Sequence, residues 1–501
     1  MSASWKVYVD GEWREATSGA KTLLHDPSNG ELVGDVPKLG KEETLRAIDA
    51  GREAFDKGPW PEMKGAERGA ILKKAAEIMS TRGEAIALLE TQNAGKPIRQ
   101  STYFDIALAV SHLGFFGELA AHNSTKKIQQ PDLEGSHGMV LREPIGLCAG
   151  ICPWNLPLLM AVWKAGPALA AGNTVILKPA SLTPLTAIEM TKALYEAGLP
   201  KNALQIITGP GGEIGSVLAS HAKVDKVSFT GSTEVGRDIM TMAAPTIKRT
   251  TLELGGKSAN VILPDADIDR AVDGSLFGIF LHAGQLCESG SRLLVPRQRE
   301  EEIVRKLVER AKSIRLGPTQ SYETDMGPLV SHGQLERVLG YIESGKSQGA
   351  HVAIGGDRPT SADLSKGFYL HPTIFSGVRP DMKIAQEEIF GPVLSVMAYN
   401  TVDDAIELAN NTIFGLAGAV WSGSTRKAMS VARRLKAGTI WINDYHMLSC
   451  YAPRGGYKQS GIGRELGMQA LEEFTETKHL YFDETGTLTP VARGLVLPPR
   501  E

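Results

Sequence analysis

From residue 146 onward, short apolar runs alternate with helix-like segments, and this alternation constrains the fold more than any other feature of the chain. The apolar runs are GLCAGI (146–151), TVIL (174–177), LQII (204–207) and KVSF (226–229). Residues 184–197 have the spacing of a helix, with Thr183 as the expected cap, Pro184 at the start and Gly198 after the end. This pattern predicts a mostly parallel sheet with helices on its faces.

A second series of alternating elements begins around residues 251–263, TLELGGKSANVIL. It continues through the apolar runs SRLLVP, VLSVMAY and GTIWIN and the helix-like segments 298–314 and 402–410. The chain has 501 residues, which is long enough for two or three structural units. The sequence therefore predicts an α/β protein with a second α/β unit.

Charge and cysteine content limit the classes of partner. The formal net charge of −3 argues against a nucleic acid or an anionic membrane as the main partner. Four cysteines are too few for a disulfide framework, so a reducing compartment is expected. The start, MSASWKVYVDGEW, lacks a signal-peptide pattern, and no apolar run is long enough to span a bilayer. We therefore expect a soluble, cytoplasmic protein.

The stretch HAGQLCESG (282–290) contains Cys287. A partly exposed thiolate is a strong nucleophile, whereas most free cysteines are small buried residues, and the stretch alone leaves both interpretations open. Cys148 and Cys152 lie in or beside an apolar run and are interpreted as packing residues. Their C-x3-C spacing lacks neighbouring histidines, so we predict no metal site. Cys450 lies in a loop, and its role is open at this point.

Two glycine-containing motifs could bind a phosphate or assist catalysis. FTGSTEVG (229–236) should open a helix, where Gly231 lets a phosphate approach the backbone; a tight strand–helix turn is the alternative. Its G-x4-G spacing does not match the usual dinucleotide fingerprint. LELGGK (252–257) places Glu253 beside two glycines, where it is either a general base or an ordinary solvated glutamate.

Two proline-containing motifs have a similar ambiguity. CPWNLP (152–157) holds Asn155, whose amide could donate to an oxyanion or bond its own loop. EEIFGPV (387–393) places Glu388 and Phe390 before a Gly-Pro turn. They could bind a ribose and a flat ring, or form an ordinary loop that enters a strand.

Together these motifs point to one family. PWNLPL, KPAS, FTGSTEVG, LELGGK, GQLC and EEIFGPV follow in this order, and in order and spacing the chain resembles the aldehyde dehydrogenase superfamily from about residue 6 to about residue 483. NDYH, GGYKQSGIGRELG and the surroundings of HAGQLC are most similar to the betaine-aldehyde and amino-aldehyde branch.

The resemblance implies an aldehyde dehydrogenase-like α/β fold with three parts. They are a Rossmann-like dinucleotide-binding domain (1–123 and 144–253), an α/β catalytic domain (254–466), and a small β oligomerisation element (124–143 and 467–485), followed by a C-terminal tail (486–501). It also implies a homodimer or homotetramer.

The same resemblance implies NAD(P)-dependent oxidation of an aldehyde to a carboxylic acid. Cys287 is then the nucleophile that forms a thiohemiacetal and afterwards a thioester. The Asn155 amide and the backbone N–H of Cys287 hold the oxyanion. Glu253 activates the water that releases the acid, a role consistent with a carboxylate base.

The implied cofactor is NAD, with NADP tolerated or comparable, and no catalytic metal. The implied cofactor-binding residues are Ile151, Trp154, Lys178, Ser181, Gly231, Ser232, Glu388 and Phe390. Strongly NAD-selective members carry a glutamate where this chain has Ser181. Because a glutamate repels a 2′-phosphate and a serine does not, we predict that NADP is used as well.

The implied substrate pocket departs from the betaine-aldehyde pattern. Its residues are Leu156, Trp163, Leu286, Glu288, Cys450 and Arg454. Leu156 and Arg454 replace two aromatic walls of a cation–π cage, so a neutral aliphatic or aromatic aldehyde is favoured, with an anionic semialdehyde as a further option. Arg454 either points to water at the rim or pairs with Glu288 and neutralises the pocket mouth.

Three alternatives remain open. One is a betaine-aldehyde, amino-aldehyde or semialdehyde dehydrogenase. A CoA-acylating or phosphate-using relative is disfavoured because Glu253 is retained. A non-catalytic structural or binding member is the most distant alternative.

Overall fold

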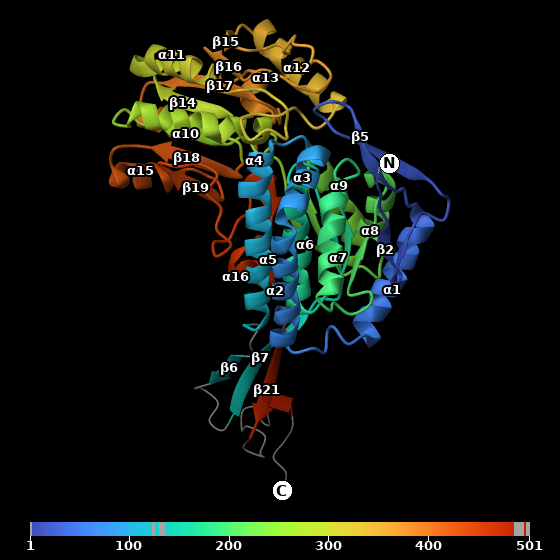
Figure 1. The fold of residues 1–501 in the computed structure, drawn as a ribbon. Helices are drawn as coiled ribbons and strands as arrows, with labels where there is room; N and C mark the ends of the chain where they lie inside the picture. The colour runs from blue at the N-terminus through green and yellow to red at the C-terminus, as the bar shows by residue number, and fades with distance from the viewer. Residues whose placement is uncertain (1–2, 123–125, 130–135, 485–494, 497–501) are drawn as a thin grey trace.

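The apolar runs predicted from the sequence form the strands of the first sheet. Branched and other apolar residues dominate them, and glycine or a turn bounds each run, as expected of buried parallel strands. The structure, a computed structural model, describes residues 3–122, 126–129, 136–484 and 495–496 (Figure 1).

The first sheet has the strand order β10-β9-β8-β11-β12-β20, and all neighbours are parallel except β20, which is antiparallel to β12. The bounds are β8 Leu147–Ile151, β9 Thr174–Lys178, β10 Leu204–Ile206, β11 Lys226–Thr230, β12 Arg249–Glu253 and β20 Gly461–Ile462. The chain runs from β8 outward to β10 and then returns to the other side of β8. The strand order thus reverses between β8 and β11, where open α/β sheets bind ligands beyond the carboxyl ends of their strands.

Helices pack around this sheet. They are α1 Lys41–Lys57, α6 Pro157–Ala171, α7 Leu185–Glu196, α8 Ser216–Ser220 and α9 Thr233–Ala243. Helix α7 confirms the helix predicted at 184–197, but the predicted cap is wrong. Pro184 occupies the cap position, and the Thr183 hydroxyl donates to the Trp154 carbonyl at 3.0 Å.

The N-terminal segment forms small sheets and a helical layer. Its elements are β1 Ala3–Ser4, β2 Val7–Val9, β3 Glu12–Arg14, β4 Lys21–His25, β5 Leu32–Pro37, α2 Gly65–Thr81, α3 Gly83–Ala94, α4 Ile98–Gln100, a π-helical turn Ser101–Ile106 and α5 Ala107–Ala120. Helices α2 and α5 lie side by side in Figure 1 and pack closely at two glycines. A Cβ on Gly69 would lie 2.2 Å from the Gly117 carbonyl oxygen, so the contact requires glycine.

The second α/β unit is built on the sheet β15-β16-β17-β14-β13-β18-β19, which is parallel apart from the β15–β16 pair. Its strands are β13 Ala259–Ile262, β14 Arg292–Pro296, β15 His351–Ile354, β16 Thr373–Ser376, β17 Val393–Tyr399, β18 Ala417–Trp421 and β19 Thr439–Ile442. Its helices are α10 Ile268–Phe280, α11 Glu300–Ala311, α12 His332–Ser347, α13 Lys383–Gln386, α14 Val402–Asn410 and α15 Thr425–Ala432. The predicted second unit is confirmed.

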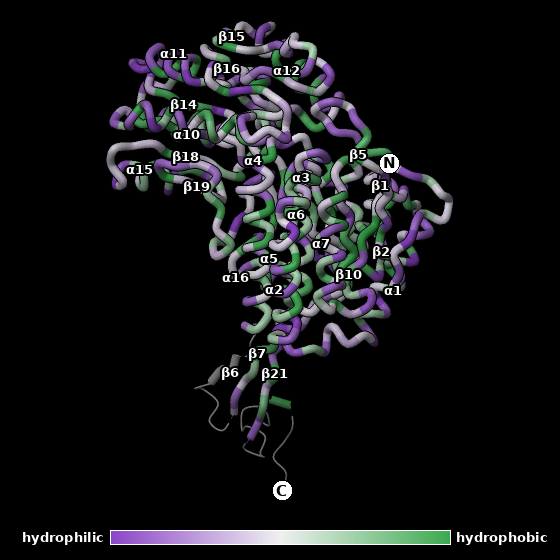
Figure 2. Tube along the Cα trace, viewed as in Figure 1, coloured by the Kyte–Doolittle hydropathy of each residue, from purple (hydrophilic) through white to green (hydrophobic). Residues whose placement is uncertain are grey.

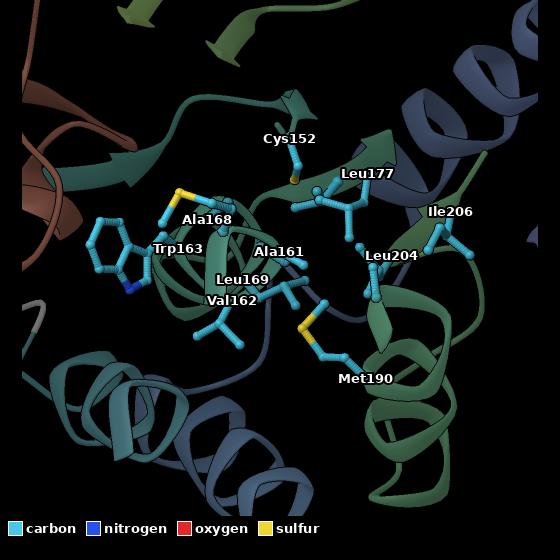
Figure 3. Close-up of a cluster of buried hydrophobic side chains, with 14 of the residues drawn as sticks. Cys152, Ala161, Val162, Trp163, Ala168, Leu169, Leu177, Met190, Leu204 and Ile206 are labelled. Carbon is cyan, nitrogen blue, oxygen red and sulfur yellow. The ribbon is translucent and has the colours of Figure 1, made fainter. Parts of the chain in front are cut away.

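Each of the two large sheets has a hydrophobic core. In Figure 2 hydrophobic residues concentrate in the central strands and helices, whereas outlying helices such as α1 and α11 carry more hydrophilic residues. Figure 3 shows part of the first core, where Cys152 points toward side chains of α6, α7, β9 and β10. Cys148 and Cys152 are both buried there, which confirms their interpretation as packing residues.

A separate small sheet has the order β21-β7-β6 and projects below the rest of the molecule in Figure 1. Its strands are β6 Lys126–Gln129, β7 Ser136–Pro144 and β21 Thr475–Asp483, and α16 Gly467–Glu472 precedes β21. It draws its strands from the two segments predicted to form the oligomerisation element. Parts of the predicted element and most of the predicted tail (123–125, 130–135, 485–494 and 497–501) lie outside the described residues.

Strand pairing refines the predicted division into domains, which stays a prediction. Strand β20 falls within the predicted catalytic span 254–466, yet it extends the sheet built from 144–253. Residues at and after this span's end, Leu466, Leu471 and Phe474, also join the core of the first sheet. The chain therefore returns to the first unit before it enters the sheet β21-β7-β6.

Candidate active site

A cavity of about 480 Å³ lies at the carboxyl edge of the first sheet, at the switch point between β8 and β11. Loops from the second unit close its other side. All of the predicted site residues except Glu253 and Cys450 line it. Those that line it are Ile151, Trp154, Asn155, Leu156, Trp163, Lys178, Ser181, Gly231, Ser232, Leu286, Cys287, Glu288, Glu388, Phe390 and Arg454.

One part of the cavity has the features of a phosphate site. Gly231 follows β11 directly, and a Cβ there would lie 2.3 Å from the Phe229 ring, so a larger residue would displace this ring. Ser232 is the N-cap of α9, and its hydroxyl accepts from the backbone N–H of Val235 at 3.3 Å. The N-terminus of this eleven-residue helix therefore opens toward the cavity, and helix N-termini favour anions.

Lys178 and Ser181 border the same part of the cavity. Burial lowers the pKa of Lys178, whose ammonium donates to the carbonyl of Pro179 at 3.2 Å. The Ser181 hydroxyl donates to the carbonyl of Gly209 at 2.8 Å, which fixes its direction. No carboxylate stands at this position to repel a phosphate.

Glu388 and Phe390 enter from the second unit. The backbone N–H of Gly256 donates to Glu388 Oε1 at 3.1 Å, and burial raises the pKa of Glu388 to about 7. Phe390 has a φ of 62° and meets Trp154 edge to face with ring centroids 5.1 Å apart. Gln334 holds the strained backbone by donating to the Phe390 carbonyl at 2.7 Å.

The loop that carries Cys287 is tightly constrained. After α10 the chain passes through the left-handed region at His282, Ala283 and Gly284, with φ values of 49°, 52° and 72°. A Cβ on Gly284 would lie 2.1 Å from the Gly391 carbonyl oxygen, so this position needs glycine. Cys287 is the one partly exposed cysteine of the four, and burial raises its pKa to about 11, against a lowering effect of Arg454.

Asn155 lies beside this loop. Its side-chain Nδ2 donates to the Gln285 carbonyl at 2.8 Å, and Gln285 in turn accepts at Oε1 from the Val330 backbone N–H at 2.9 Å. An amide group has two N–H donors, so one bond positions Asn155 and the second remains for a ligand in the cavity.

Arg454 is buried, with 8% of its surface exposed, so the predicted alternative of a rim residue that points to water is wrong. The reason is its ion pair: Arg454 Nη2 and Nε donate to Glu288 Oε2 at 2.6 and 3.1 Å. The expected pairing with Glu288 is confirmed, inside the pocket. The Arg454 guanidinium also lies 5.2 Å from the centre of the Trp163 ring.

Glu253 lies at the end of β12, buried behind the cavity wall. Arg454 Nη1 is 3.8 Å from Glu253 Oε2, and among the described residues neither carboxylate oxygen has a hydrogen-bond partner. Burial and then the nearby Glu465 raise the pKa of Glu253 to about 8. The alternative of a solvated surface glutamate is therefore wrong.

The prediction that Cys450 lines the pocket is wrong. Leu448, two residues earlier, lines the cavity, but Cys450 packs in the core of the first unit. Its carbonyl accepts from the Gly467 N–H at 2.8 Å, which turns the loop inward.

Three important residues were not identified from the sequence. His446 bonds Glu288 through Nδ1 at 3.0 Å, and Lys164 forms a buried hydrogen-bonded ion pair with Glu465. Lys164 did carry a signal, because it is a charged residue within the apolar segment PLLMAVWKAGPALAA. His446 lies in NDYH, which indicated the branch of the family but no role.

The described residues contain no group of three or more histidine, cysteine or acidic side chains placed to hold a metal ion. In the same part of the chain, no helix combines the length and apolar character needed to cross a membrane.

Fold and site together define a doubly wound α/β protein with a cysteine at the end of a dinucleotide-type cleft. Comparison with known sequences agrees: the profile described as the aldehyde dehydrogenase family matches residues 13–480, and the chain belongs to this family. It is 45% identical to the betaine aldehyde dehydrogenase of Bacillus subtilis (strain 168), over 95% of this chain and 97% of that protein. It is 42% identical to aldehyde dehydrogenase 1A1 of Mesocricetus auratus, over 94% of each chain.

Solved structures give the same result. The betaine aldehyde dehydrogenase from Staphylococcus aureus in complex with NAD+ superposes with a TM-score of 0.94 at 41% identity, covering 97% of this chain and 96% of that one. The NAD-dependent aldehyde dehydrogenase from Sinorhizobium meliloti has a TM-score of 0.95 at 38% identity, with coverage of 98% and 96%. The predicted fold and family are confirmed.

Proposed function

We propose that this protein oxidises an aldehyde to the carboxylic acid, with Cys287 as nucleophile and NAD or NADP as hydride acceptor. The observation that carries the proposal is the position of the Cys287 thiol: it lines the same cavity as the Asn155 amide and the glycine turn at Gly231. Family membership supports the class of reaction.

Each step uses groups of this chain. The Cys287 thiolate attacks the aldehyde carbon, a C–S bond forms, and the carbonyl π electrons move to oxygen. The free N–H of Asn155 donates to that oxyanion, and such a donor is worth about 2.7–4 kcal/mol of barrier. The C=O bond re-forms as the former aldehyde carbon gives up hydride to the nicotinamide cofactor that the cleft would hold, which leaves the thioester. Glu253 then takes a proton from water, the hydroxide adds to the acyl carbon, and the C–S bond breaks to return the thiolate.

The cleft fits a dinucleotide. The Ser232-capped N-terminus of α9 and the Gly231 turn suit the diphosphate, and Lys178 and Glu388 line the same cavity as candidate partners of the two ribose groups. Trp154 and Phe390 provide aromatic surface in the same cavity. When bound there, NAD or NADP supplies the chemistry of a hydride acceptor.

Use of both cofactors follows from Ser181. A carboxylate at this position would repel the 2′-phosphate of NADP, whereas the Ser181 hydroxyl is engaged with the Gly209 carbonyl and carries no charge. The relatives solved with NAD+ support NAD as one of the two.

For the substrate, we favour a neutral aliphatic or aromatic aldehyde. A quaternary ammonium group would use the face of Trp163, but the Arg454 guanidinium already lies 5.2 Å from that ring and carries a like charge. An anionic semialdehyde gains little from Arg454, because Glu288 already pairs with it. Betaine aldehyde is kept as the second candidate because the similar proteins from Bacillus subtilis and Staphylococcus aureus carry that name.

Assembly and location are part of the proposal. The sheet β21-β7-β6 projects from the molecule and exposes the apolar side chains Tyr481 and Phe482, which suits an oligomerisation element of a homodimer or homotetramer. Sedimentation of a Tyr481→Ser, Phe482→Ser variant should show smaller species than the unmodified protein. The four free cysteines are consistent with the cytoplasm.

Steady-state oxidation of an aldehyde panel tests the function. Aliphatic, aromatic, betaine-type and semialdehyde substrates are supplied with NAD or NADP, and reduced cofactor is followed by absorbance. We expect activity with neutral aldehydes that disappears in Cys287→Ala. Undiminished turnover by Cys287→Ala, or a folded protein inactive with the whole panel, would overturn the proposal.

A further inference from the structure

The Arg454 guanidinium faces three acidic groups inside the pocket. Its Nη2 donates to Cys287 Sγ at 3.5 Å and to Glu288 Oε2 at 2.6 Å, and its Nη1 lies 3.8 Å from Glu253 Oε2. A charged guanidinium thus lies between the proposed nucleophile and the proposed base. The mechanism given above does not use it.

We propose that Arg454 is a catalytic residue that stabilises the Cys287 thiolate, and that Glu288 and His446 are positioning residues that hold the guanidinium against the sulfur. This inference rests on the proposed function, because it assumes that Cys287 is the nucleophile.

The electrostatics of Cys287 require such a group. Burial disfavours the thiolate, and the negative charges of Glu288 and Glu388 also disfavour it. Arg454 opposes these effects through its positive charge and through a hydrogen bond to the sulfur. Reactive cysteines are typically found beside such a cation.

Arg454 is fixed in place from both ends. Its backbone exchanges two hydrogen bonds with Glu465, Arg454 N to Glu465 O at 2.6 Å and Glu465 N to Arg454 O at 2.7 Å. Its side chain is held by Glu288. Although burial alone would raise the pKa of Glu288, Arg454 and then His446 hold it down to about 2, so the carboxylate stays charged.

His446 completes the arrangement behind Glu288. Its Nδ1 lies 3.0 Å from Glu288 Oε1 and its Nε2 lies 3.0 Å from the Gly278 carbonyl oxygen. The His446 ring is thus held between these two partners, and it supports Glu288 on the side away from Arg454.

The test measures the thiol directly. Peptide-resolved mass spectrometry follows the rate of alkylation of Cys287 by iodoacetamide between about pH 6 and about pH 10, without aldehyde or cofactor, and a shift of the midpoint is read from the change in rate at each pH below it. A single opposite charge within about 4–6 Å usually moves a pKa by about 1–3 units. We expect Arg454→Leu to raise the alkylation midpoint by at least about one unit, which slows the reaction about tenfold below the midpoint. Arg454→Lys should recover part of this loss.

Glu288→Gln separates an electrostatic role from a structural one. It removes the charge that offsets Arg454 while keeping a hydrogen-bonding group, so the midpoint should fall. A loop that merely loosens would shift both variants in the same direction. The proposal is overturned if the alkylation midpoint shifts in the same direction in Arg454→Leu and in Glu288→Gln. It is also overturned if the midpoint is unchanged in Arg454→Leu.

Two further variants keep the test secure. Arg454→Leu leaves Glu288 buried without a partner, so the double variant Arg454→Leu, Glu288→Leu provides a protein without a lone buried charge. Its midpoint should still lie above the unmodified one, because Arg454 contacts the sulfur directly. Arg434→Leu is the matched control: Arg434 pairs with the exposed Asp403 at 2.7 Å outside the cavity, and its loss should leave the profile unchanged.

Failure of this inference can be distinguished from failure of the proposed function. Alkylation needs no turnover, so an unmoved midpoint in Arg454→Leu combined with lost turnover in Cys287→Ala overturns the role of Arg454 alone. An Arg454 effect as expected, combined with full turnover by Cys287→Ala, overturns the assignment of Cys287 as the nucleophile and with it this role.

Discussion

Replacement of Glu253 by glutamine should stabilise the protein, and by an amount that grows with pH. The pKa of Glu253 is raised from 4.5 to about 8 by burial first and by Glu465 second. As the pH rises between these values, the unfolded chain releases this proton and the folded chain keeps it, so folding stability falls. The stabilisation that comes from the proton on Glu253 is therefore fully present below the pKa of this group in the unfolded chain. It is lost as the pH rises through the pKa of Glu253 in the folded protein.

The size of this change in stability follows from the difference between the pKa values of Glu253 in the unfolded and folded chain. One pKa unit corresponds to about 1.4 kcal/mol, so keeping this carboxyl in the folded protein above about pH 8 costs about 3–5 kcal/mol. Glutamine has nearly the same shape and cannot ionise. The gain in free energy of unfolding for Glu253→Gln should thus be below about 1 kcal/mol near pH 5 and should reach about 3–5 kcal/mol near pH 9.

Urea unfolding followed by tryptophan fluorescence at several pH values measures this difference. Glu309→Gln is the control, since that side chain is 77% exposed and its replacement should change stability by less than about 0.5 kcal/mol at every pH. A pH-independent difference for Glu253→Gln, or a loss of stability at high pH, would refute the reasoning. The same variant should lose about 10²–10⁴-fold in turnover, because it lacks the proposed base.

Three other predictions concern activity. Asn155→Ala should lower kcat about 10²–10³-fold through the loss of an oxyanion donor, with a smaller effect on KM; an unchanged kcat would exclude that role. Ser181→Glu should lower kcat/KM with NADP by at least about tenfold relative to NAD through charge repulsion, measured with one aldehyde at fixed salt. In a double-mutant cycle of Glu288→Ser and Arg454→Trp, the effects on kcat/KM should be strongly non-additive, because the two residues share one buried ion pair; additive effects would contradict the pairing.

The positions of the strands in the first sheet could be predicted because local sequence decides them. TVIL and KVSF are β-branched or apolar runs of strand length, bounded by glycines and turns, and both became buried parallel strands. The helix at 184–197 was equally local. The cap of this helix is not decided by local sequence, because the Thr183 hydroxyl donates to the Trp154 carbonyl, which lies in a loop 29 residues earlier.

The residues of the candidate site also fall into two groups: those that a local motif identifies and those whose environment depends on residues distant in the sequence. Cys287, Glu253 and Asn155 could be identified because each lies in a short motif that resembles the family. The buried environment of Arg454 could not be predicted from the sequence, because it depends on Glu288, which is 166 residues away in the sequence. Cys450 was misplaced for a related reason: the bond of its carbonyl to the Gly467 N–H turns it into the core, although Leu448 faces the cavity.

Mass spectrometry of the Glu253→Gln variant after incubation with a neutral aldehyde and NAD tests the central claim most directly. Without the proposed base the thioester should accumulate. The account predicts one acyl group per chain, mapped to the peptide that contains Cys287 and absent from Cys287→Ala. An acyl group on a different residue, or rapid turnover by Glu253→Gln with no trapped acyl group, would contradict it.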